Sequence, residues 1–407
     1  MSEVGAEAAA ALEPGVGRHA QRLLLLVGPV LLIETMFFTA VAPLLPYYEE
    51  SLGLSKFQAG VLVGAYGAGC FAGAIPGGVF ASRVGVKPTM IVGLILLAAL
   101  SVVFAFATSI WLLDAARFGQ GVGAALAWTG ALSWLVMEGS RERRGELIGI
   151  ATAAAAAGAL LGPALGGVAS VVGTRPTFAA AALPALILAV ACLLVTGPTA
   201  RVAQHPRSLI AAIKRPRLAT GLWLMTLASL ALGALDVLAP LRLGHLGMSG
   251  AAIGAIFLAA AATQTGANVF VGRHADRRGR SATLRLVLAA AIAVALGLMV
   301  ADTNWLLALL VVCAGTVFGA FFAPSMALVA DEAELAGIEL VLVLALLNIA
   351  WSPGQLIGST GSGALASAAG DGAPYLVLAI LCLGSLALLG RLTRARNRPA
   401  SVPGGNR

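Results

Sequence analysis

Charged residues are scarce in this chain, and their scarcity limits its class. Only 11% of the 407 residues are Asp, Glu, Lys or Arg, while 59% are hydrophobic. Soluble domains carry about 25% charged residues. The composition therefore excludes an ordinary soluble domain and indicates a chain that lies in a membrane.

Cysteine and the usual catalytic patterns are also sparse. All four cysteines fall in apolar stretches, so we expect neither a disulfide framework nor a metal site. The glycine-rich segments lack the lysine of a phosphate-binding loop, and no basic face with interleaved aromatic residues indicates nucleic-acid binding. We therefore expect no enzyme activity, no cofactor and no nucleic-acid partner.

Long apolar runs are what the sequence does contain. A helix of about 20 residues crosses the roughly 30 Å of hydrocarbon in a bilayer. The runs predict an all-α membrane protein with twelve transmembrane helices, over 22–44, 57–81, 88–108, 110–136, 146–171, 177–197, 217–241, 251–271, 283–301, 304–329, 338–368 and 373–390. The first run is too long for a secretory signal, so we expect an uncleaved helix.

The basic residues predict the orientation of the chain. With the amino terminus in the cytoplasm, all but four of the 26 Lys and Arg fall in cytoplasmic segments; Lys56, Arg175 and Arg242 lie outside, and Arg117 lies in a span. This asymmetry fits the positive-inside rule and places both termini in the cytoplasm. We expect a monomeric, multi-pass protein of the cell inner (plasma) membrane, surrounded by lipid bilayer.

The chain also repeats itself. A shift of 194 residues places Pro46 on Pro240, Gly53 on Gly247, Arg83 on Arg277 and Trp111 on Trp305. Matches of these types at one offset predict two parallel six-helix repeats. We expect an N-terminal tail over 1–21, a first bundle over 22–197, a basic linker over 198–216, a second bundle over 217–390 and a tail over 391–407. The linker leaves no room for two further spans.

The most specific pattern is GIATAAAAAGALLGPALGG, residues 149–167. Three glycines recur at every fourth residue, so they share one helix face and let a neighbouring backbone approach: Gly158, Gly162 and Gly166. Pro163 removes one helical hydrogen bond and bends that helix. A face for helix packing explains the period alone, but it explains neither Gly149 nor the ending at Gly167.

The whole pattern, Gly-x8-Gly-x3-Gly-Pro-x2-Gly-Gly, resembles the antiporter motif in the fifth span of drug:proton antiporters of the major facilitator superfamily. In the fourth span, Arg117-Phe-Gly-Gln120-Gly resembles a further motif of that family. Glu34, followed by Pro43 and Pro46, resembles the first-span pattern of its twelve-span exporters. The resemblance covers nearly the whole chain and implies the major facilitator fold.

Two loops resemble the superfamily's loop motif, Gly-x-Leu-Ala-Asp-Arg-x-Gly-Arg-Lys. The first contains Gly78, Arg83 and Gly85, and the second contains Gly272, Asp276, Arg277 and Gly279. The resemblance implies that the motif Asp helps to close a cytoplasmic gate. Two residues depart from the family pattern, because Ser82 replaces the first loop Asp and Glu34 replaces the usual first-span Asp. We therefore expect the first-half gate to be the weaker one.

Ionisable residues inside the spans are candidates for chemistry because each is costly in hydrocarbon. They are Glu34, Asp114, Arg117 and Asp236. Glu34 lies near mid-membrane, where loss of water favours a protonated carboxyl. We expect proton coupling at Glu34 with Arg117 as its modulator, and Asp236 as the second candidate. The alternatives are a structural Glu34–Arg117 ion pair, a wet interfacial Asp236, and local pairing of Asp114.

Polar and aromatic residues of the spans are candidates for the lining of a substrate cavity. They are Tyr66, Trp128, Gln264, Asn268, Asn348, Trp351 and Gln355. Helix packing explains each of them equally well. We also expect the fifth helix to pack near this cavity on the eleventh, because Gly354 and Gly358 repeat Gly162 and Gly166. The acidic run at 331–334 is expected in a solvated cytoplasmic loop.

These features together predict a secondary active transporter that exports small organic molecules or drugs in exchange for protons, by alternating access. A sugar or metabolite uniporter or symporter of the same superfamily is the alternative. A membrane receptor or scaffold would need an added soluble domain, which the sequence does not show.

Overall fold

The computed structural model describes residues 14–138, 144–195, 215–336 and 340–396. Every regular element in these ranges is helical. The predicted linker falls almost entirely outside the described residues, and so do most of the predicted N-terminal tail and much of the C-terminal one.

Helices occupy all twelve predicted spans, which confirms the all-α prediction. The elements are α2 (Pro14–Thr39), η1 (Ala42–Leu44), α3 (Leu45–Leu52), α4 (Lys56–Val84), α5 (Val86–Phe106), α6 (Ile110–Glu138), α7 (Arg144–Val172), α8 (Thr174–Leu194), α10 (Pro216–His245), α11 (Gly250–Arg278), α12 (Arg280–Val300), α13 (Asn304–Gly319), α14 (Phe322–Leu335), α15 (Leu340–Ala369) and α16 (Gly372–Arg396). By length and composition, 10 spans within the described residues are able to cross a membrane.

Two predicted spans are broken, and proline explains both breaks. The first span continues beyond α2 as η1 and α3, because Pro43 and Pro46 lack the amide hydrogen that a continuous helix needs. The tenth span divides into α13 and α14 around Ala320 and Phe321, just before Pro324. Both breaks lie in segments that hydropathy alone assigns to single helices.

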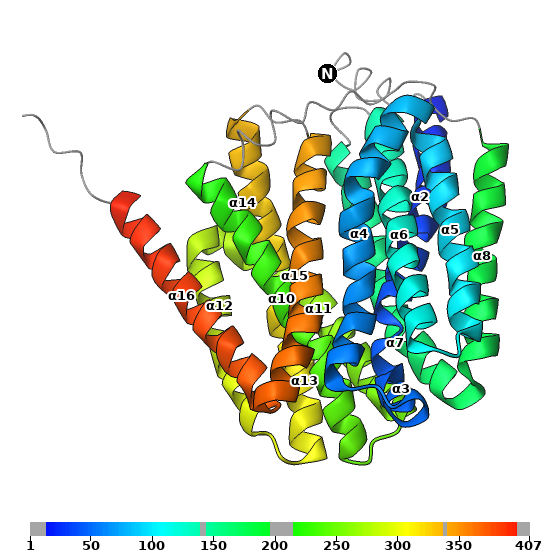
Figure 1. Cartoon of the computed structure of the whole chain (residues 1–407). Coiled ribbons are helices and arrows are strands. Elements are labelled where there is room, and N and C mark those ends of the chain that lie inside the picture. The colour runs from blue at the N-terminus through cyan, green and yellow to red at the C-terminus, as the bar shows by residue number, and fades with distance from the viewer. Residues whose placement is uncertain (1–13, 139–143, 196–214, 337–339, 397–407) are drawn as a thin grey trace, which may run out of the picture.

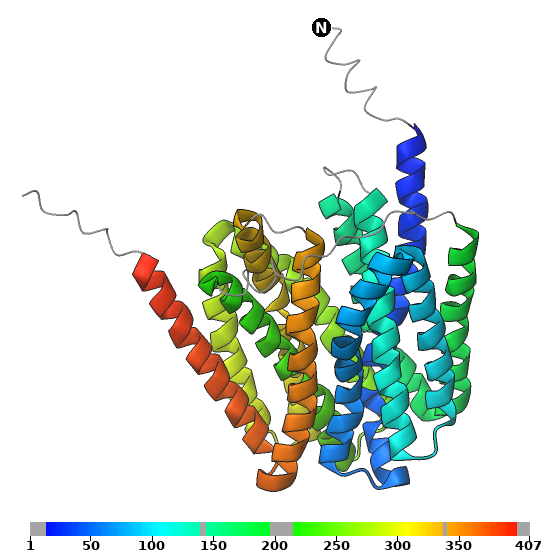
Figure 2. The same ribbon diagram turned by 45° about the horizontal axis from the view of Figure 1, so that its top comes forward.

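The helices run between two ends of the bundle. We name one end after helix α3 and the other after Gly85. The α3 end holds α3 and the first turns of α4 and α11, and the Gly85 end holds the turns at Gly85 and Gly279. They are the bottom and the top of Figure 1. Figure 2 shows the first turns of α2 projecting beyond the Gly85 end. The predicted orientation places the α3 end outside the cell.

Matched turns appear in the parts of the chain before and after the predicted linker. Glycines with φ between 67° and 112° form two pairs separated by the predicted 194 residues: Gly53 with Gly247, and Gly85 with Gly279. A side chain is disfavoured at such φ values. At the same offset, Ser55 caps α4 and Ser249 caps α11 by accepting an amide hydrogen bond. The same turn chemistry is therefore used twice.

Glycine faces join the two parts of the chain at the α3 end. On α4, a Cβ at Gly60 would lie 2.5 Å from the Ser359 carbonyl oxygen of α15, and one at Gly67 would lie 3.2 Å from that of Ser352. On α11, a Cβ at Gly254 would lie 2.8 Å from the Pro163 carbonyl oxygen of α7. These backbones are therefore in direct contact, as small residues allow.

The α7–α11 contact ends before the Gly85 end. Gly149 precedes Gly167 by 18 residues, and Gly272 follows Gly254 by 18, so each pair lies five turns apart on one helix face. Gly167 and Gly254 meet across the helix pair, whereas nothing lies within 4 Å of a Cβ built at Gly149 or Gly272. The two helices therefore touch at the α3 end and separate at the Gly85 end.

The acidic run belongs to a helix, so the prediction of a solvated loop for it was wrong. Residues 331–334 form the last turns of α14. Asp331 pairs with Arg280 at the start of α12, and Glu332 accepts a 3.1 Å bond from Arg217 at the start of α10. The run therefore ties three helix ends together at the Gly85 end.

The geometry predicts a bulky side chain at Gly149 or Gly272 to block closure of the Gly85 end. Leu at either position meets open space in the present state but faces the opposite helix when the ends close. Such overpacking costs about 1–3 kcal/mol, which predicts transport about five- to a hundredfold slower at normal abundance. The measurement is substrate flux in proteoliposomes.

Gly266→Leu is the matched control. Gly266 also has nothing within 4 Å of its Cβ position, but it lies a third of a turn away from the face that Gly254 and Gly272 share. Equal loss of transport in the Gly266 and Gly272 variants contradicts the face argument.

Candidate functional site

Glu34 lies in the last two turns of α2, five residues before Thr39, and is 9% exposed. Its Oε1 accepts a 2.9 Å hydrogen bond from the Tyr66 hydroxyl of α4, and its Oε2 accepts a 3.1 Å bond from the Thr35 hydroxyl. Both partners are neutral. The carboxyl is therefore held in place without a cation to offset a buried negative charge, which is costly.

Arg117 on α6 lies close by but faces away from that carboxyl. It is 1% exposed and donates to the carbonyl oxygens of Phe37 at 2.9 Å and Phe38 at 3.1 Å, and to Gln120 Oε1 at 3.0 Å. Its guanidinium carbon stands 4.6 Å from the centre of the Tyr66 ring. Tyr66 thus contacts the acid with its hydroxyl and the base with its ring face.

The ion pairs considered from the sequence are not formed among the described residues. Arg117 is paired with neither Glu34 nor Asp114, and the buried Oδ1 of Asp114 has no hydrogen-bond partner there. The local pairing expected for Asp114 is therefore wrong. Arg117 instead fixes the end of α2 through main-chain oxygens, just after the turn that carries Glu34.

Asp236 enters the same region from α10. It accepts a 3.3 Å hydrogen bond from Gln355 on α15, whose side chain is 1% exposed. Gln355 also packs on α4, where its Cβ lies 3.3 Å from the Cβ position of Gly67, the residue after Tyr66. Asp236 therefore adds a second acid, from the other part of the chain, beside this helix.

Aromatic side chains connect the two parts of the chain beside Glu34. The ring of Phe38 lies 5.2 Å from that of Tyr66 and 5.1 Å from that of Trp351, which it meets edge-on. Tyr66 also packs with Cys70 and Ala124. Sequence reasoning missed Phe38, although it follows Glu34 by four residues and so shares its helix face.

The structure groups some of the predicted cavity residues and separates others. Tyr66, Trp351 and Gln355 lie with Glu34 and Asp236, as described above. Gln264 instead lies where a Cβ on Gly319 would stand, Asn348 accepts from Ser352 of its own helix at 3.3 Å, and Trp128 packs on the main core. The buried Oδ1 of Asn268 has no partner among the described residues.

The glycine face of the antiporter-like pattern packs on the helix that carries Glu34. A Cβ at Gly158 would meet the Leu32 carbonyl oxygen, one at Gly162 the Thr39 hydroxyl, and one at Gly166 the Ala40 carbonyl oxygen. The predicted contact of the fifth helix with the eleventh is therefore wrong. Gly354 and Gly358 of the eleventh pack instead on Ser229 and Leu230 of the seventh.

A threonine hydroxyl donates to the carbonyl oxygen that Pro163 frees in α7, and another donates to α15 near Pro353. Pro163 has no amide hydrogen, so the Ala159 carbonyl oxygen loses its helical partner and accepts from Thr39 at 3.4 Å. In α15, the carbonyl that loses its helical partner at Pro353 is that of Ile349, and Thr226 donates at 2.9 Å to the carbonyl oxygen of the next residue, Ala350. The bend of α7 is thus joined to α2 one turn beyond Glu34.

The gate residues lie apart at the Gly85 end. Ser82 donates to Val79 of its own helix at 2.8 Å, and Arg83 is exposed. Asp276 and Arg277 are exposed as well, and Asp276 forms no ion pair with any described residue. Within the described residues, the salt bridges therefore include none of Arg83, Asp276 and Arg277.

Leu in place of Gly162 is expected to push α2 away from α7 and displace Glu34. The inserted side chain meets the Thr39 hydroxyl, a clash that costs about 1–3 kcal/mol. Transport should fall more than membrane insertion does. Gly384→Leu on α16, where nothing lies within 4 Å of a Cβ, is the control. Normal transport and abundance of the Gly162 variant would refute the packing argument.

Comparison with known proteins places these features in a family. The Major Facilitator Superfamily model matches residues 27–338. An uncharacterized MFS-type transporter of Yersinia pestis is 26% identical over 360 residues, which cover 88% of this chain and 92% of that protein. A probable vesicular acetylcholine transporter-B of Danio rerio is 30% identical over 185 residues, and the match spans only 36% of that protein's length.

A solved structure shares the fold. The inward-facing, unoccupied structure of a bacterial homolog to the human lysosomal transporter Spinster superposes with a TM-score of 0.76 at 15% identity, over 94% of this chain and 99% of that chain. The family match covers well over half of the sequence. The chain is therefore a multi-pass membrane transporter that belongs to the Major Facilitator Superfamily.

Proposed function

We propose that this transporter exports small organic molecules in exchange for protons, by alternating access between two six-helix halves. The observation that carries the proposal is Glu34, a buried acid held by neutral hydroxyls beside aromatic residues from both parts of the chain. The antiporter-like glycine face packs directly on its helix. The matched glycine turns at a 194-residue offset support the two halves.

In this proposal the protein lies in the inner membrane of the cell. Its Gly85 end faces the cytoplasm, and both termini lie on that side. A substrate enters from the Gly85 end and releases a proton from Glu34. The halves then rock, the α3 end opens, and the substrate leaves. A proton from outside returns to Glu34 and allows the reverse movement. Arg117 modulates the carboxyl through Tyr66, and Asp236 is the second acid of the site.

The site also supports a class of substrate. Phe38, Tyr66 and Trp351 offer ring faces, while Arg117 already donates to three oxygens. The carboxyls of Glu34 and Asp236 remain to contact a ligand. Small organic molecules with aromatic or cationic groups suit such a site. Gln355 and the two acids fix the orientation of the ligand in this proposal.

Replacement of Glu34 by Gln is expected to abolish gradient-driven export. Gln keeps the size and hydrogen bonding of the side chain but carries no titratable proton. The measurement uses inverted vesicles with an acidic lumen, in which an exporter accumulates substrate and raises the pH of the lumen. Glu34→Asp should keep part of the activity, and substrate binding by the Gln variant should persist.

The same vesicles separate the alternatives. Export by Glu34→Gln at the wild-type rate refutes the assignment and makes Asp236 the better candidate. Substrate movement out of the lumen together with protons indicates a symporter instead, and movement that is indifferent to the proton gradient indicates a uniporter.

The two gate motifs are expected to differ in strength. Asp276 carries a charge that can pair when the Gly85 end closes, whereas Ser82 offers only a hydrogen bond, which it spends on its own helix. Asp276→Asn should therefore reduce export much more than Ser82→Ala does, by roughly tenfold for a lost charge-assisted bond. Similar export rates of the two variants would contradict the proposal.

A further inference from the structure

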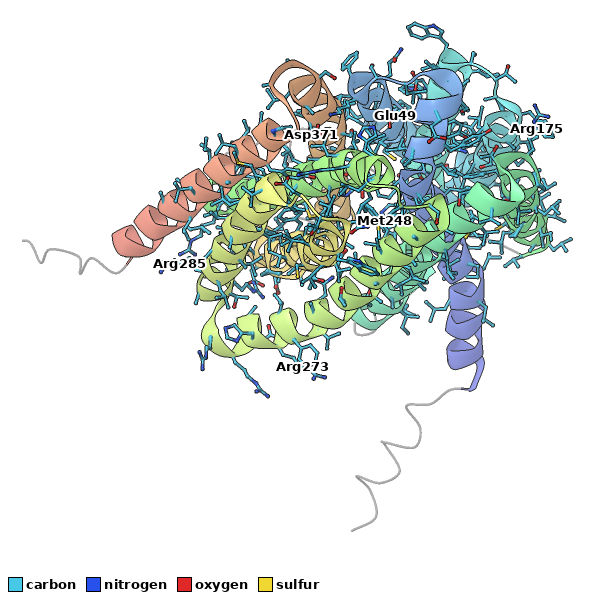
Figure 3. All side chains as sticks on the ribbon, turned by 90° about the horizontal axis from the view of Figure 1, so that it is seen from below. Glu49, Arg175, Met248, Arg273, Arg285 and Asp371 are labelled. Carbon is cyan, nitrogen blue, oxygen red and sulfur yellow. The ribbon has the colours of Figure 1, made fainter. Side chains whose placement is uncertain are left out.

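An ion pair joins the two parts of the chain at the α3 end. Nε2 of His245, the last residue of α10, lies 3.0 Å from Oε2 of Glu49 on α3. The His245 side chain is 51% exposed and that of Glu49 is 24% exposed, so both reach the surface. Figure 3 views the molecule from this end and labels Glu49. The pair therefore joins the two parts of the chain at a solvent-accessible place.

Close packing fixes this contact. A Cβ at Gly244 would lie 2.8 Å from the Cβ of Pro46, so α3 rests directly on the last turn of α10. Pro46 is the second residue of α3, a position where its missing amide hydrogen costs no helical bond. Glu49 follows it by three residues and so lies on the side that faces α10. Separation of α3 from α10 would break the Glu49–His245 pair and this packing together.

The other charges at this end are engaged elsewhere or exposed. Arg242 donates to the last turn of α12 and pairs with Asp302 at 3.2 Å, and Lys56 pairs with Asp371 at 2.5 Å. Glu50 on α3 is exposed and forms no ion pair within the described residues. Glu49 is therefore the carboxylate that meets His245.

We propose that the Glu49–His245 pair is a second proton-binding site, distinct from Glu34, whose occupation holds the α3 end shut. A protonated imidazole forms an ion pair with Glu49, and a neutral one forms at most a hydrogen bond. Because the partners come from opposite parts of the chain, the ion pair exists only when this end is closed. Acid therefore shifts the population toward the closed α3 end.

The place of this site in transport rests on the proposed function and its orientation. If the α3 end faces outside, external protons act twice in each export cycle. They load Glu34 after the substrate has left, and they favour closure of the outer side through His245. Both effects drive the same return step. The site needs no substrate, so its behaviour is measurable on the resting protein.

The test measures the distance across the α3 end in nanodiscs. Spin labels are attached to cysteines introduced at two exposed positions, Ser51 on α3 and Trp305 on α13. The background carries Cys313→Ala, because Cys313 is partly exposed whereas the other three cysteines are buried. Distances are compared at about pH 5.5 and about pH 8, on either side of the usual imidazole range. The open population should rise about two- to fivefold at the higher pH, as expected for a partly exposed pair.

Substitutions at the pair give matched controls. His245→Lys keeps a charge at both pH values and should hold the end closed at both. In the Glu34→Gln background, His245→Gln and Glu49→Gln should give the more open distribution at both. Asp371→Asn removes the neighbouring pair, which contains no imidazole, and should weaken closure equally at both pH values.

The Glu34→Gln background separates this proposal from the proposed function. The pH response of the α3 end should persist there, because it does not need Glu34. A pH response that is missing in Glu34→Gln, or that survives in the Glu34→Gln, His245→Gln double variant, overturns the second proton site. Loss of the response in Glu34→Gln alone assigns the effect to Glu34.

Discussion

The cost of a carboxyl inside an apolar bundle governs the rest of this structure. Glu34 is bonded by hydroxyls beside aromatic rings, while Arg117 donates to two main-chain oxygens of the same helix. Among the described residues a full charge at this position has no direct counter-charge, so any change in the carboxyl's protonation changes the energy of its surroundings. Helix α7 and the rings of Phe38, Tyr66 and Trp351 are part of those surroundings.

Glycine spacing joins the helix of this carboxyl to the rest of the bundle. The α7 face that contains Gly158, Gly162 and Gly166 fixes α7 to α2, whereas the face that contains Gly149 and Gly167 is turned toward α11. One helix thus holds the acid on one side and forms the contact between the two parts of the chain on the other. This division explains why Gly149 falls outside the four-residue period, since it belongs to the second face.

The sequence predicted those features that depend on local patterns, namely the helices and the ionisable residues inside them. Apolar runs fixed the helices, and charge in hydrocarbon selected Glu34, Arg117 and Asp236, which the structure brings into one region. The sequence could not predict which helices pack together. The glycine faces of α7 and α15 are chemically alike, so the partner of each is known only from the contacts in the structure. Phe38 and Thr39 were missed since an aromatic or hydroxyl residue in an apolar helix carries no signal until its neighbour is known. The helical acidic run was missed for the same reason, as Arg280 and Arg217 are distant in sequence.

The account depends on one claim, that Glu34 holds a proton in the resting protein and gives it up when substrate binds. Infrared difference spectroscopy of the purified transporter measures this directly, by following the stretching band of a protonated carboxyl as substrate is added. We predict that wild-type protein loses this band and that the loss is absent in Glu34→Gln. Loss of an identical band in the Gln variant, or no change in the wild-type protein, would contradict the account.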